Sequence, residues 1–508
     1  MLDKKHLLNF LMLIVVYNTT IAQRIKYSDT EKEDGRQMNF ELVGKIANNI
    51  IVYKNIRTDN YFSVYDNDMK LKEKIKLTNL PIKLINVDFV AYPNYFYLIF
   101  QHQKKKIVYC DAIKYDMNGK MLEDIKTLDT TSIPIFDNNN KIYNVVVSDN
   151  KKFIGIIKAN KKNERNHILG KIMYDQNLQQ AYKRFYNIAM DGKNNYLSEF
   201  TIDNDGDIFM AKCFAASDNA FVNRVDILHI PIVTDTIVTY NVKTNERLLD
   251  EIKLKMDNAN KKLLVNAFYF TKKRGNIEGY FINAINKTNP NDSYSTTTAF
   301  SDTLRLEAKD VGTLKTAFND FFIRQIYPRK DGGFIATAES YYYSTRNNGM
   351  PFNRFDYFGN TSLFTPFDFY NMGMRNFSWN QFDRMGNNFT TYYAENVLVL
   401  SFNKLAILEW SNVIHKSQKD DNTEDKISYE VIITGGRLHF LFNEKDRNDF
   451  LMNDNSISPQ GQIIRHPTLK NLDRRYTLMP RYGKQISATE MVFPCIYKNY
   501  ICFAKIEY

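Results

Sequence analysis

One segment of the chain gathers several carboxylates within five residues. It reads Asp203-Asn204-Asp205-Gly206-Asp207 and runs directly into the apolar stretch Ile208-Phe209-Met210-Ala211. Clustered carboxylates could bind calcium, but an EF-hand-like loop places its glycine sixth and a glutamate further on. Here the glycine is fourth and a hydrophobic strand follows at once. We therefore expect a hairpin turn rather than a calcium site, and we predict no metal-binding residues.

A second segment, from Tyr341 to Tyr393, is dense in aromatic residues with Asn, Arg and Gly between them. Exposed aromatic clusters usually mark interaction surfaces, and such rings could stack on sugars or contact a hydrophobic partner. The alternative is that the rings pack over the neighbouring sheet and cover it. The candidate contacts for a ligand or partner are Tyr341, Tyr342, Tyr343, Arg346, Arg354 and Trp379.

A basic cluster lies near the C-terminus. It consists of Arg474, Arg475, Arg481 and Lys484. Guanidinium and ammonium groups could bind an anion, although a solvated loop or a network of ion pairs is the interpretation that we favour.

Signatures of catalysis are missing from the sequence. It contains no GxSxG elbow, no Walker A sequence and no HExxH motif. Its seven histidines never occur at the spacing of metal ligands, although residues that are scattered in sequence can converge in space. We therefore assign no catalytic residue and no cofactor, and an enzyme is the less favoured class.

The first 22 residues resemble a secretory signal. Lys4 and Lys5 precede an apolar run from Leu7 to Tyr17, and Thr20-Ile21-Ala22 offers small residues for cleavage before Gln23. The run is short for a membrane anchor, which is the alternative, and no later apolar stretch is long enough to span a bilayer. Cleavage would remove Lys4, Lys5 and Asp3, so the net charge of +11 would become +10. For an exported protein, nucleic acid is not an expected partner. The basic charge could serve an anionic glycan or the cell envelope, although a Lys- and Asn-heavy composition with no specific target is the interpretation that we favour.

Most of the remaining chain reads as short strands. Apolar runs of four to eight residues, rich in aromatic and β-branched side chains, alternate with polar turns, as in Tyr95–Phe100 and Asn396–Leu400. This pattern indicates a sandwich, barrel or propeller.

A weak repeat favours the propeller. The repeated pattern is a strand that ends in an aromatic residue, then a polar turn, and then a second strand. The copies begin at Tyr65, Tyr115, Tyr174, Tyr240, Phe300, Phe402 and Ser458. Apart from one interval of 102 residues, the starts lie 50 to 66 residues apart, near the period of a four-stranded blade. A second sequence pattern, a turn followed by a buried strand, recurs at 203–211, 331–338 and 435–442. We predict an all-β propeller at 23–508 of about seven four-stranded blades, with six or eight fitting nearly as well. One aromatic-rich loop is inserted at 341–393.

Two of the four cysteines flank a plausible two-residue turn. Cys495 and Cys502 would lie opposite each other if Lys498-Asn499 form that turn. Export permits a disulfide, but this would be a wide, hydrogen-bonded pair, where a bridge is harder to form. Two buried thiols are the favoured interpretation, and the disulfide remains the alternative.

The chain also resembles an uncharacterised family of exported β-rich proteins from Bacteroidota-type bacteria. The resemblance rests on the following segments: Ala22-Gln23, 332–336, 339–342, 466–475, 480–485 and 500–506. It covers most of the chain after Ala22 and implies export. It implies no activity, cofactor or catalytic residue.

These observations predict an exported, non-catalytic binding or scaffold module of the cell envelope, in the periplasm or at the cell surface. The expected partner is an envelope protein or a glycan. The main alternative is a glycan-active enzyme of propeller fold, with carboxylates at the central channel. A further alternative is an outer-membrane-associated subunit that docks through the aromatic segment.

Overall fold

The computed structural model describes most of the chain as strand. The described residues are 23–32, 35, 38–133, 141–163, 165–190, 192, 195–215, 221–272, 275–309, 318–345, 390–446, 449–469 and 476–508. The expected signal segment, 1–22, lies outside them. No helix in these ranges is long and apolar enough to cross a membrane.

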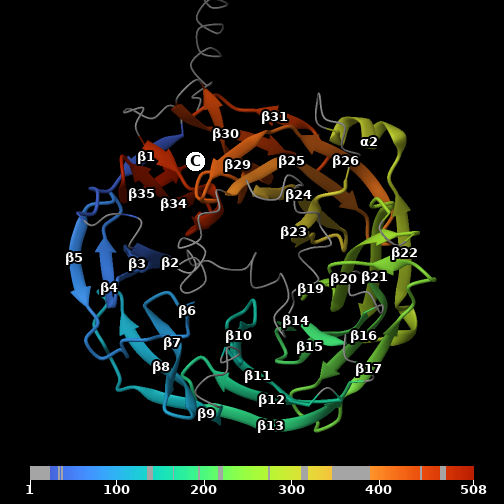
Figure 1. Ribbon diagram of the computed structural model, residues 1–508, viewed down its shortest axis with the longest axis horizontal. Helices are drawn as coiled ribbons and strands as arrows, with labels where there is room; N and C mark the ends of the chain where they lie inside the picture. Colours follow the sequence, from blue (N-terminus) through green and yellow to red (C-terminus); the bar gives the residue numbers. More distant parts are fainter. Residues whose placement is uncertain are drawn as a thin grey trace, which may run out of the picture.

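The strands form antiparallel sheets arranged around a ring (Figure 1). Blade 1 contains β2 (Met38–Ile46), β3 (Asn49–Ile56), β4 (Asp59–Tyr65) and β5 (Leu71–Lys76). Blade 2 contains β6 (Asn86–Ala91), β7 (Tyr95–Lys104), β8 (Ile107–Asp116) and β9 (Lys126–Ser132). Blade 3 contains β10 (Tyr143–Val147), β11 (Phe153–Asn163), β12 (Asn166–Asp175) and β13 (Gln180–Ala189).

Blades 4 and 5 are joined in one nine-stranded sheet. Blade 4 contains β14 (Tyr196–Ile202), β15 (Ile208–Ala215), β16 (Val222–Ile230) and β17 (Val238–Val242). Blade 5 contains β19 (Lys253–Asp257), β20 (Lys262–Phe270), β21 (Gly279–Asn286) and β22 (Tyr294–Ala299). The short strand β18 (Leu248–Leu249) pairs with both β16 and β20 and so connects them. The 3-10 helix η2 (Pro290–Asp292) precedes β22, and α2 (Asp302–Ala308) follows it.

The last three blades complete the ring. Blade 6 contains β23 (Phe321–Pro328), β24 (Phe334–Thr345), β25 (Thr390–Phe402), β26 (Leu408–Ile414) and the added strand β27 (Gln418–Asp421). Blade 7 contains β28 (Tyr429–Thr434), β29 (Arg437–Asp446), β30 (Asp449–Ile457) and β31 (Ile463–Arg465). Blade 8 contains β32 (Tyr476–Leu478), η3 (Pro480–Tyr482), β33 (Lys484–Gln485), β34 (Glu490–Tyr497), β35 (Tyr500–Glu507) and β1 (Arg24–Tyr27). Strands β2, β6, β10, β14, β19 and β23 lie on the inner side of the ring (Figure 1).

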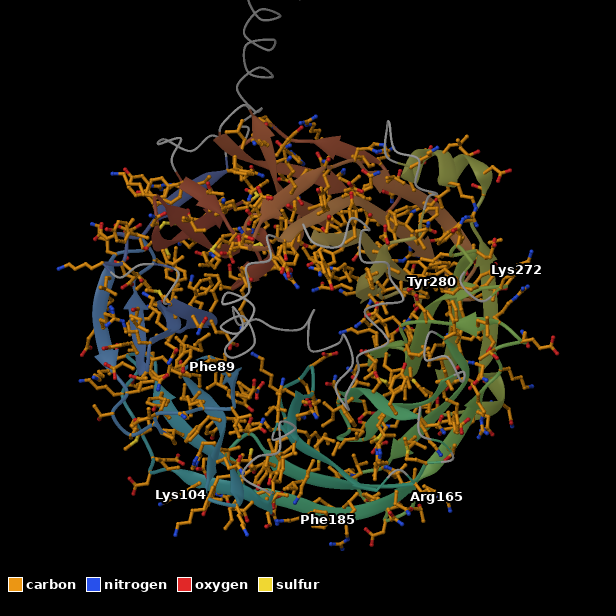
Figure 2. All side chains as sticks on the ribbon, viewed as in Figure 1. Phe89, Lys104, Arg165, Phe185, Lys272 and Tyr280 are labelled. Carbon is orange, nitrogen blue, oxygen red and sulfur yellow. A yellow bond between two sulfur atoms is a disulfide. The ribbon has the colours of Figure 1, made fainter. Side chains whose placement is uncertain are left out.

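The propeller prediction is therefore confirmed. Over the described ranges the strands form seven hydrogen-bonded sheets, one of which contains two four-stranded units. Divided in this way, the ring has eight four-stranded units, the upper end of the predicted range. Side chains fill the space between neighbouring blades, as at Phe89 and Tyr280, whereas Lys104, Arg165 and Lys272 lie at the rim (Figure 2).

The two ends of the described chain meet in blade 8. Strand β1 pairs antiparallel with β35, from Arg24 opposite Glu507 to Tyr27 opposite Ala504. The backbone N–H of Ser28 extends this ladder by donating to the carbonyl of Phe503 at 2.8 Å. The first described strand thus supplies the outer strand of the last blade and closes the ring (Figure 1).

The predicted repeat corresponds to a recurring turn between the third and fourth strands of a blade. In blade 2 the Asp116 carboxylate accepts hydrogen bonds from the backbone of Asn118 and Lys120, both at 2.8 Å. The following Gly119 adopts φ +74°, which suits glycine. The same arrangement recurs at Asp66, Asp175, Asn403 and Ser458. The second repeated pattern, at 203–211, 331–338 and 435–442, contains the turn between the first and second strands of blades 4, 6 and 7.

Two copies of the repeat do not lie between third and fourth strands. The copy at Tyr240 begins in the outer strand β17, where the Asn241 side chain donates to Asp226 at 2.8 Å. Its turn, closed by the Arg247 N–H donating to the Thr244 carbonyl at 3.1 Å, leads into β18. The copy at Phe300 precedes α2, and Ser301 caps that helix by accepting from the backbone of Leu304. In both places the polar side chain serves a neighbouring element.

The remaining expectations concern the cysteines and the insertion. The register of β34 and β35 is as predicted, and Cys495 and Cys502 form a disulfide with Cα atoms 5.1 Å apart, contrary to the favoured interpretation. Cys110 and Cys213 are buried free thiols.

Strand β24 continues to Thr345 and β25 begins at Thr390, so both ends of the expected 341–393 loop are strand. Residues 346–389 lie outside the described residues.

The closure of the ring leads to a stability prediction. A chain that starts at residue 29 lacks β1, whereas a chain that starts at Gln23 keeps it. Because β1 contributes about four ladder hydrogen bonds, each worth about 0.5–1.5 kcal/mol, we expect the shorter chain to lose about 2–6 kcal/mol. Its uncovered β35 edge should also favour self-association. Thermal melting and size-exclusion chromatography of both chains check this, and equal behaviour would contradict the role assigned to β1.

Candidate functional site

Two strands of blade 6 are long, with 12 residues in β24 and 13 in β25. Strands β24 and β25 remain paired as far as Thr345 opposite Thr390. Along this part β25 exchanges its outer partner, from β26 to β27, which pairs Ala394 with Gln418 and Thr391 with Asp421. We call this three-stranded part the extension, and define it as Tyr341–Thr345, Thr390–Ala394 and β27.

The three predicted tyrosines lie in the extension with different exposures. Tyr341 is 3% exposed and packs against Phe322 and Ala394. Tyr342 is 9% exposed, stacks on Tyr393 with ring centroids 4.6 Å apart, and donates its hydroxyl hydrogen to Glu395 at 2.6 Å. These two rings belong mainly to the interior.

The partly exposed rings of the extension are Tyr343, Tyr392 and Tyr393. Tyr343 lies 5.9 Å from Tyr392, centroid to centroid. The sequence singled out Tyr343 among these but not Tyr392 or Tyr393, because their exposure depends on how the strands pair. Arg346, Arg354 and Trp379 lie outside the described residues.

A buried group of charges supports the base of the extension. The Glu339 carboxylate is fully buried, with Oε1 2.7 Å from the Lys416 ammonium. Its Oε2 accepts from Ser428 Oγ at 2.7 Å and lies 3.6 Å from Arg324. Burial opposes the charge, but Lys416 and then Arg324 hold the pKa of Glu339 below its ordinary value. The carboxylate is therefore ionised and fixed on several sides, which makes it a structural anchor.

Three glutamates on the first strands of their blades have raised pKa values. Burial raises the pKa of Glu41 to about 8, against the pull of Lys484, and raises those of Glu199 and Glu430 to about 7. Such groups can hold a proton near neutral pH, as a general acid must. They lie on β2, β14 and β28, which belong to three different blades.

The two described members of the basic cluster contact protein groups. Arg481 forms an ion pair with Glu424. Lys484 donates to the carbonyl oxygens of Leu42 at 2.9 Å and Val43 at 3.2 Å. Arg481 thus takes part in an ion pair, whereas Lys484 binds main-chain oxygens of β2. Arg474 and Arg475 lie outside the described residues.

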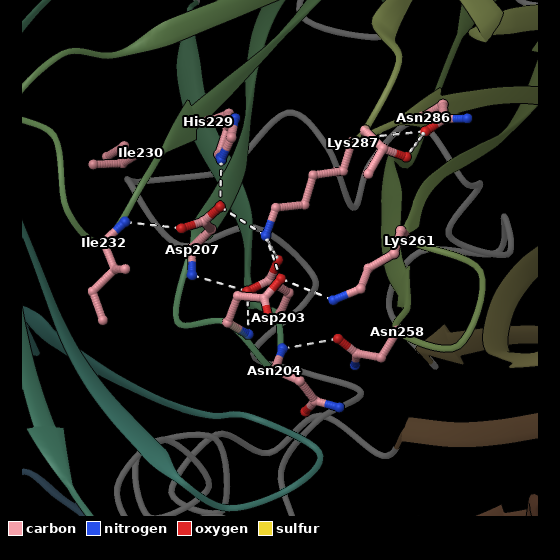
Figure 3. A network of polar contacts seen from close by, with 12 residues as sticks. Asp203, Asn204, Asp207, His229, Ile230, Ile232, Asn258, Lys261, Asn286 and Lys287 are labelled. Atoms are coloured by element: carbon pink, nitrogen blue, oxygen red, sulfur yellow. Dashed lines mark hydrogen bonds and ion pairs between the residues drawn. The ribbon is translucent and has the colours of Figure 1, made fainter.

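The aspartate-rich segment forms the expected turn, between β14 and β15. Asp203 accepts from the backbone N–H groups of Asp205 and Asp207, both at 2.9 Å. The Lys287 ammonium contacts all three aspartates, at 2.9 Å from Asp205 and 2.8 Å from Asp207 (Figure 3). Although burial opposes its charge, hydrogen bonds from His229 and Lys287 hold the pKa of Asp207 well below its usual range. A lysine therefore supplies the positive charge that a calcium ion would bring.

The spacing of residues in the sequence did not predict one group of neighbouring side chains. His439, Asp454 and His466 come together in blade 7, with their potential ligand atoms within 4.8 Å of one another. They lie on or beside three adjacent strands, so only the pairing register of blade 7 could have revealed the group.

Comparisons with known proteins concern the fold alone. No family model matches the chain, and no curated protein sequence matches it. Similar solved structures include prolyl oligopeptidase B from Galerina marginata, with 9% identity, a TM-score of 0.39, and coverage of 91% of this chain and 56% of that one. Oligopeptidase B from Leishmania major has 7% identity, a TM-score of 0.38, and coverage of 91% and 54%. An ulvan lyase bound to -[GlcA(1-4)Rha3S]- has 10% identity, a TM-score of 0.35, and coverage of 82% and 90%. The chain spans slightly more than half the length of the peptidases.

The buried anchor can be tested by removing one partner. Lys416→Met leaves the Glu339 charge without its nearest cation, and we expect a loss of about 3–5 kcal/mol in unfolding free energy. The neutral double variant Glu339→Gln/Lys416→Met should recover part of this loss. Urea unfolding measures both, with Lys419→Met on the exposed face of β27 as the control. Equal effects of Lys416→Met and Lys419→Met would contradict the anchor.

The raised pKa of Glu430 predicts how the unfolding free energy depends on pH. Burial raises its pKa from 4.5 to about 7, so the folded state holds this proton more tightly than the unfolded chain does. The resulting stabilisation is complete below pH 4.5 and is lost as the pH rises through 7. Glu430→Gln should therefore gain stability relative to wild type over this interval, on the order of 2 kcal/mol. Urea unfolding at both ends of the interval checks this, and a difference that does not change with pH would contradict it.

Proposed function

We propose that this chain is an exported binding or scaffold module of the cell envelope, and that blade 6 presents its contact surface. The observation that carries the proposal is the extension, a three-stranded part of blade 6 with partly exposed Tyr343, Tyr392 and Tyr393. Rigid aromatic side chains supply contact area at low entropic cost, and interaction surfaces are enriched in them. The expected partner is a glycan or an envelope protein.

The base of the extension supports this role because a contact surface must be held in place. Buried Tyr341 and Tyr342 fix the two long strands from within, and Glu339, which pairs with Lys416, precedes them on β24. The exposed rings thus stand on a packed support. Function is commonly carried in this way, by projecting segments on a rigid scaffold.

Export is the second part of the proposal, together with membership of the Bacteroidota-type family. The segment before Gln23 has the character of a secretory signal, and β1 begins at Arg24, so cleavage there would leave the closing strand intact. The disulfide between Cys495 and Cys502 fits an oxidising compartment. The periplasm or the cell surface follows as the location.

The alternative, a glycan-active enzyme, rests on the three glutamates with raised pKa values. A glycosidase needs two carboxyl groups roughly 5–10 Å apart beside one open site. Glu199, one of the three, is already paired with Lys253 at 3.4 Å and accepts from the backbone N–H of Leu254 at 3.2 Å. These contacts favour a structural role for Glu199, and with it the binding module.

Replacing residues 346–389 with a short Asn-Gly turn tests the contact surface. Because Thr345 and Thr390 are directly paired, such a turn can join them and leave both strands in place. Because this variant keeps Tyr343, Tyr392 and Tyr393, we expect unchanged thermal melting and retained binding on a glycan array and in pull-downs from envelope fractions. The double variant Tyr343→Ser/Tyr392→Ser should weaken that binding without lowering the melting temperature.

The matched control is Phe185→Ser, which removes an exposed aromatic ring from the outer strand of blade 3. It should leave binding unchanged. If Tyr343→Ser/Tyr392→Ser melts normally and still binds every target of the wild type, the contact surface lies elsewhere and the proposal fails.

A further inference from the structure

A cluster of polar side chains lies on the face of blade 7 that packs against blade 8. His439 on β29 pairs with Ser456 on β30, and His466 follows β31 with its backbone N–H donating to the carbonyl of Asp454 at 2.9 Å. Because side chains alternate along strands, this register places all four on the same face. His439, Asp454 and Ser456 are buried, and His466 is partly exposed.

The contacts within the group bring nitrogen and oxygen atoms together. His439 Nδ1 lies 3.0 Å from each carboxylate oxygen of Asp454. The two imidazole rings lie with centroids 5.1 Å apart, and His466 Nε2 is 2.8 Å from Ser456 Oγ. A carboxylate and two imidazoles therefore face a common volume.

Both ends of the described chain orient the carboxylate. The Tyr508 hydroxyl donates to Asp454 Oδ2 at 3.1 Å, and the Gln23 side-chain amide donates to the same oxygen. The Tyr508 ring also meets His439 edge to face at 4.8 Å. Such outer partners fix the geometry of metal ligands in proteins.

We propose that His439, Asp454 and His466 bind one divalent transition-metal ion of the Zn²⁺ type at the junction of blades 7 and 8. Two imidazoles and one carboxylate suit zinc and its neighbours in the first transition row. A fourth position remains for water. The ion would stabilise the closed ring, because its outer partners come from the two chain ends that closure brings together.

Binding requires a small contraction. The ligand atoms lie within 4.8 Å of one another, whereas neighbouring ligands of a tetrahedral zinc ion lie about 3.4 Å apart. His466 can supply this movement because it follows the short outer strand β31, which pairs through three residues only. His439 and Asp454, which lie on longer strands, keep their places.

Two other histidines each pair with a single carboxylate, and they differ in this from the group of His439, Asp454 and His466. His102 lies 2.8 Å from Asp111, and His229 lies 3.0 Å from Asp207. Each of these pairs has one imidazole and one carboxylate but belongs to no group of three in the described residues. His102→Ala is therefore a matched control.

The test uses residues 23–508, purified on a tag without histidine and stripped with a chelator. Calorimetric titration with Zn²⁺ and visible spectroscopy with Co²⁺ should show one equivalent per chain in the wild type and in His102→Ala. His466→Ala and Asp454→Asn should abolish it. Tyr508→Phe should weaken it about ten- to a hundredfold.

Thermal melting separates binding from folding. The metal-free His466→Ala variant should melt like metal-free wild type, since His466 is partly exposed, and only the wild type should melt higher when Zn²⁺ is added. Failure of the wild type to bind an equivalent overturns the proposal. So does binding that His466→Ala and Asp454→Asn leave unchanged.

Discussion

The pairing of β1 with β35 is the interaction on which the remaining blades depend. Each blade buries both of its faces, one against each neighbour, so an open array would expose the apolar face at either end. Four residues from the beginning of the described chain, Arg24–Tyr27, complete a sheet built from its end. The ladder joins positions nearly the whole chain apart. It converts a row of sheets into a ring without an uncovered face.

Polar pairs between neighbouring blades add a second constraint, because they fix the angle at which one blade packs on the next. Lys287 of blade 5 contacts the aspartate turn of blade 4, and Ser428, just before blade 7, donates to Glu339 of blade 6. A buried charge that loses its partner is expensive. We infer that these pairs fix how each blade sits on the next.

The sequence was most informative where chemistry is local. The turn at Asp116 needs only a carboxylate, two backbone N–H groups and a glycine with positive φ, all within five residues, so its repeat could be recognised. Tyr341 and Tyr343 have the same residue type, yet only the pairing of β24 with β25 buries one and leaves the other partly exposed. Likewise His439 and His466 lie 27 residues apart and meet through the register of blade 7. Exposure and convergence are properties of strand pairing, which composition does not encode.

Blade 6 shows how a closed ring can acquire a distinct surface without losing its symmetry. Strand β25 has two successive partners on one side, β26 and then β27. Strand β20 likewise pairs first with β19 and then with β18. In blade 6 the change of partner leaves the propeller core intact and adds a sheet that contacts blade 7, where the Gln418 side chain donates to the carbonyl of Asn443 at 2.7 Å. Aromatic residues placed there gain exposure, while Glu339 and Lys416 at the junction hold the added sheet to the ring. A binding surface can therefore vary in sequence while the closure and the inter-blade pairs remain unchanged.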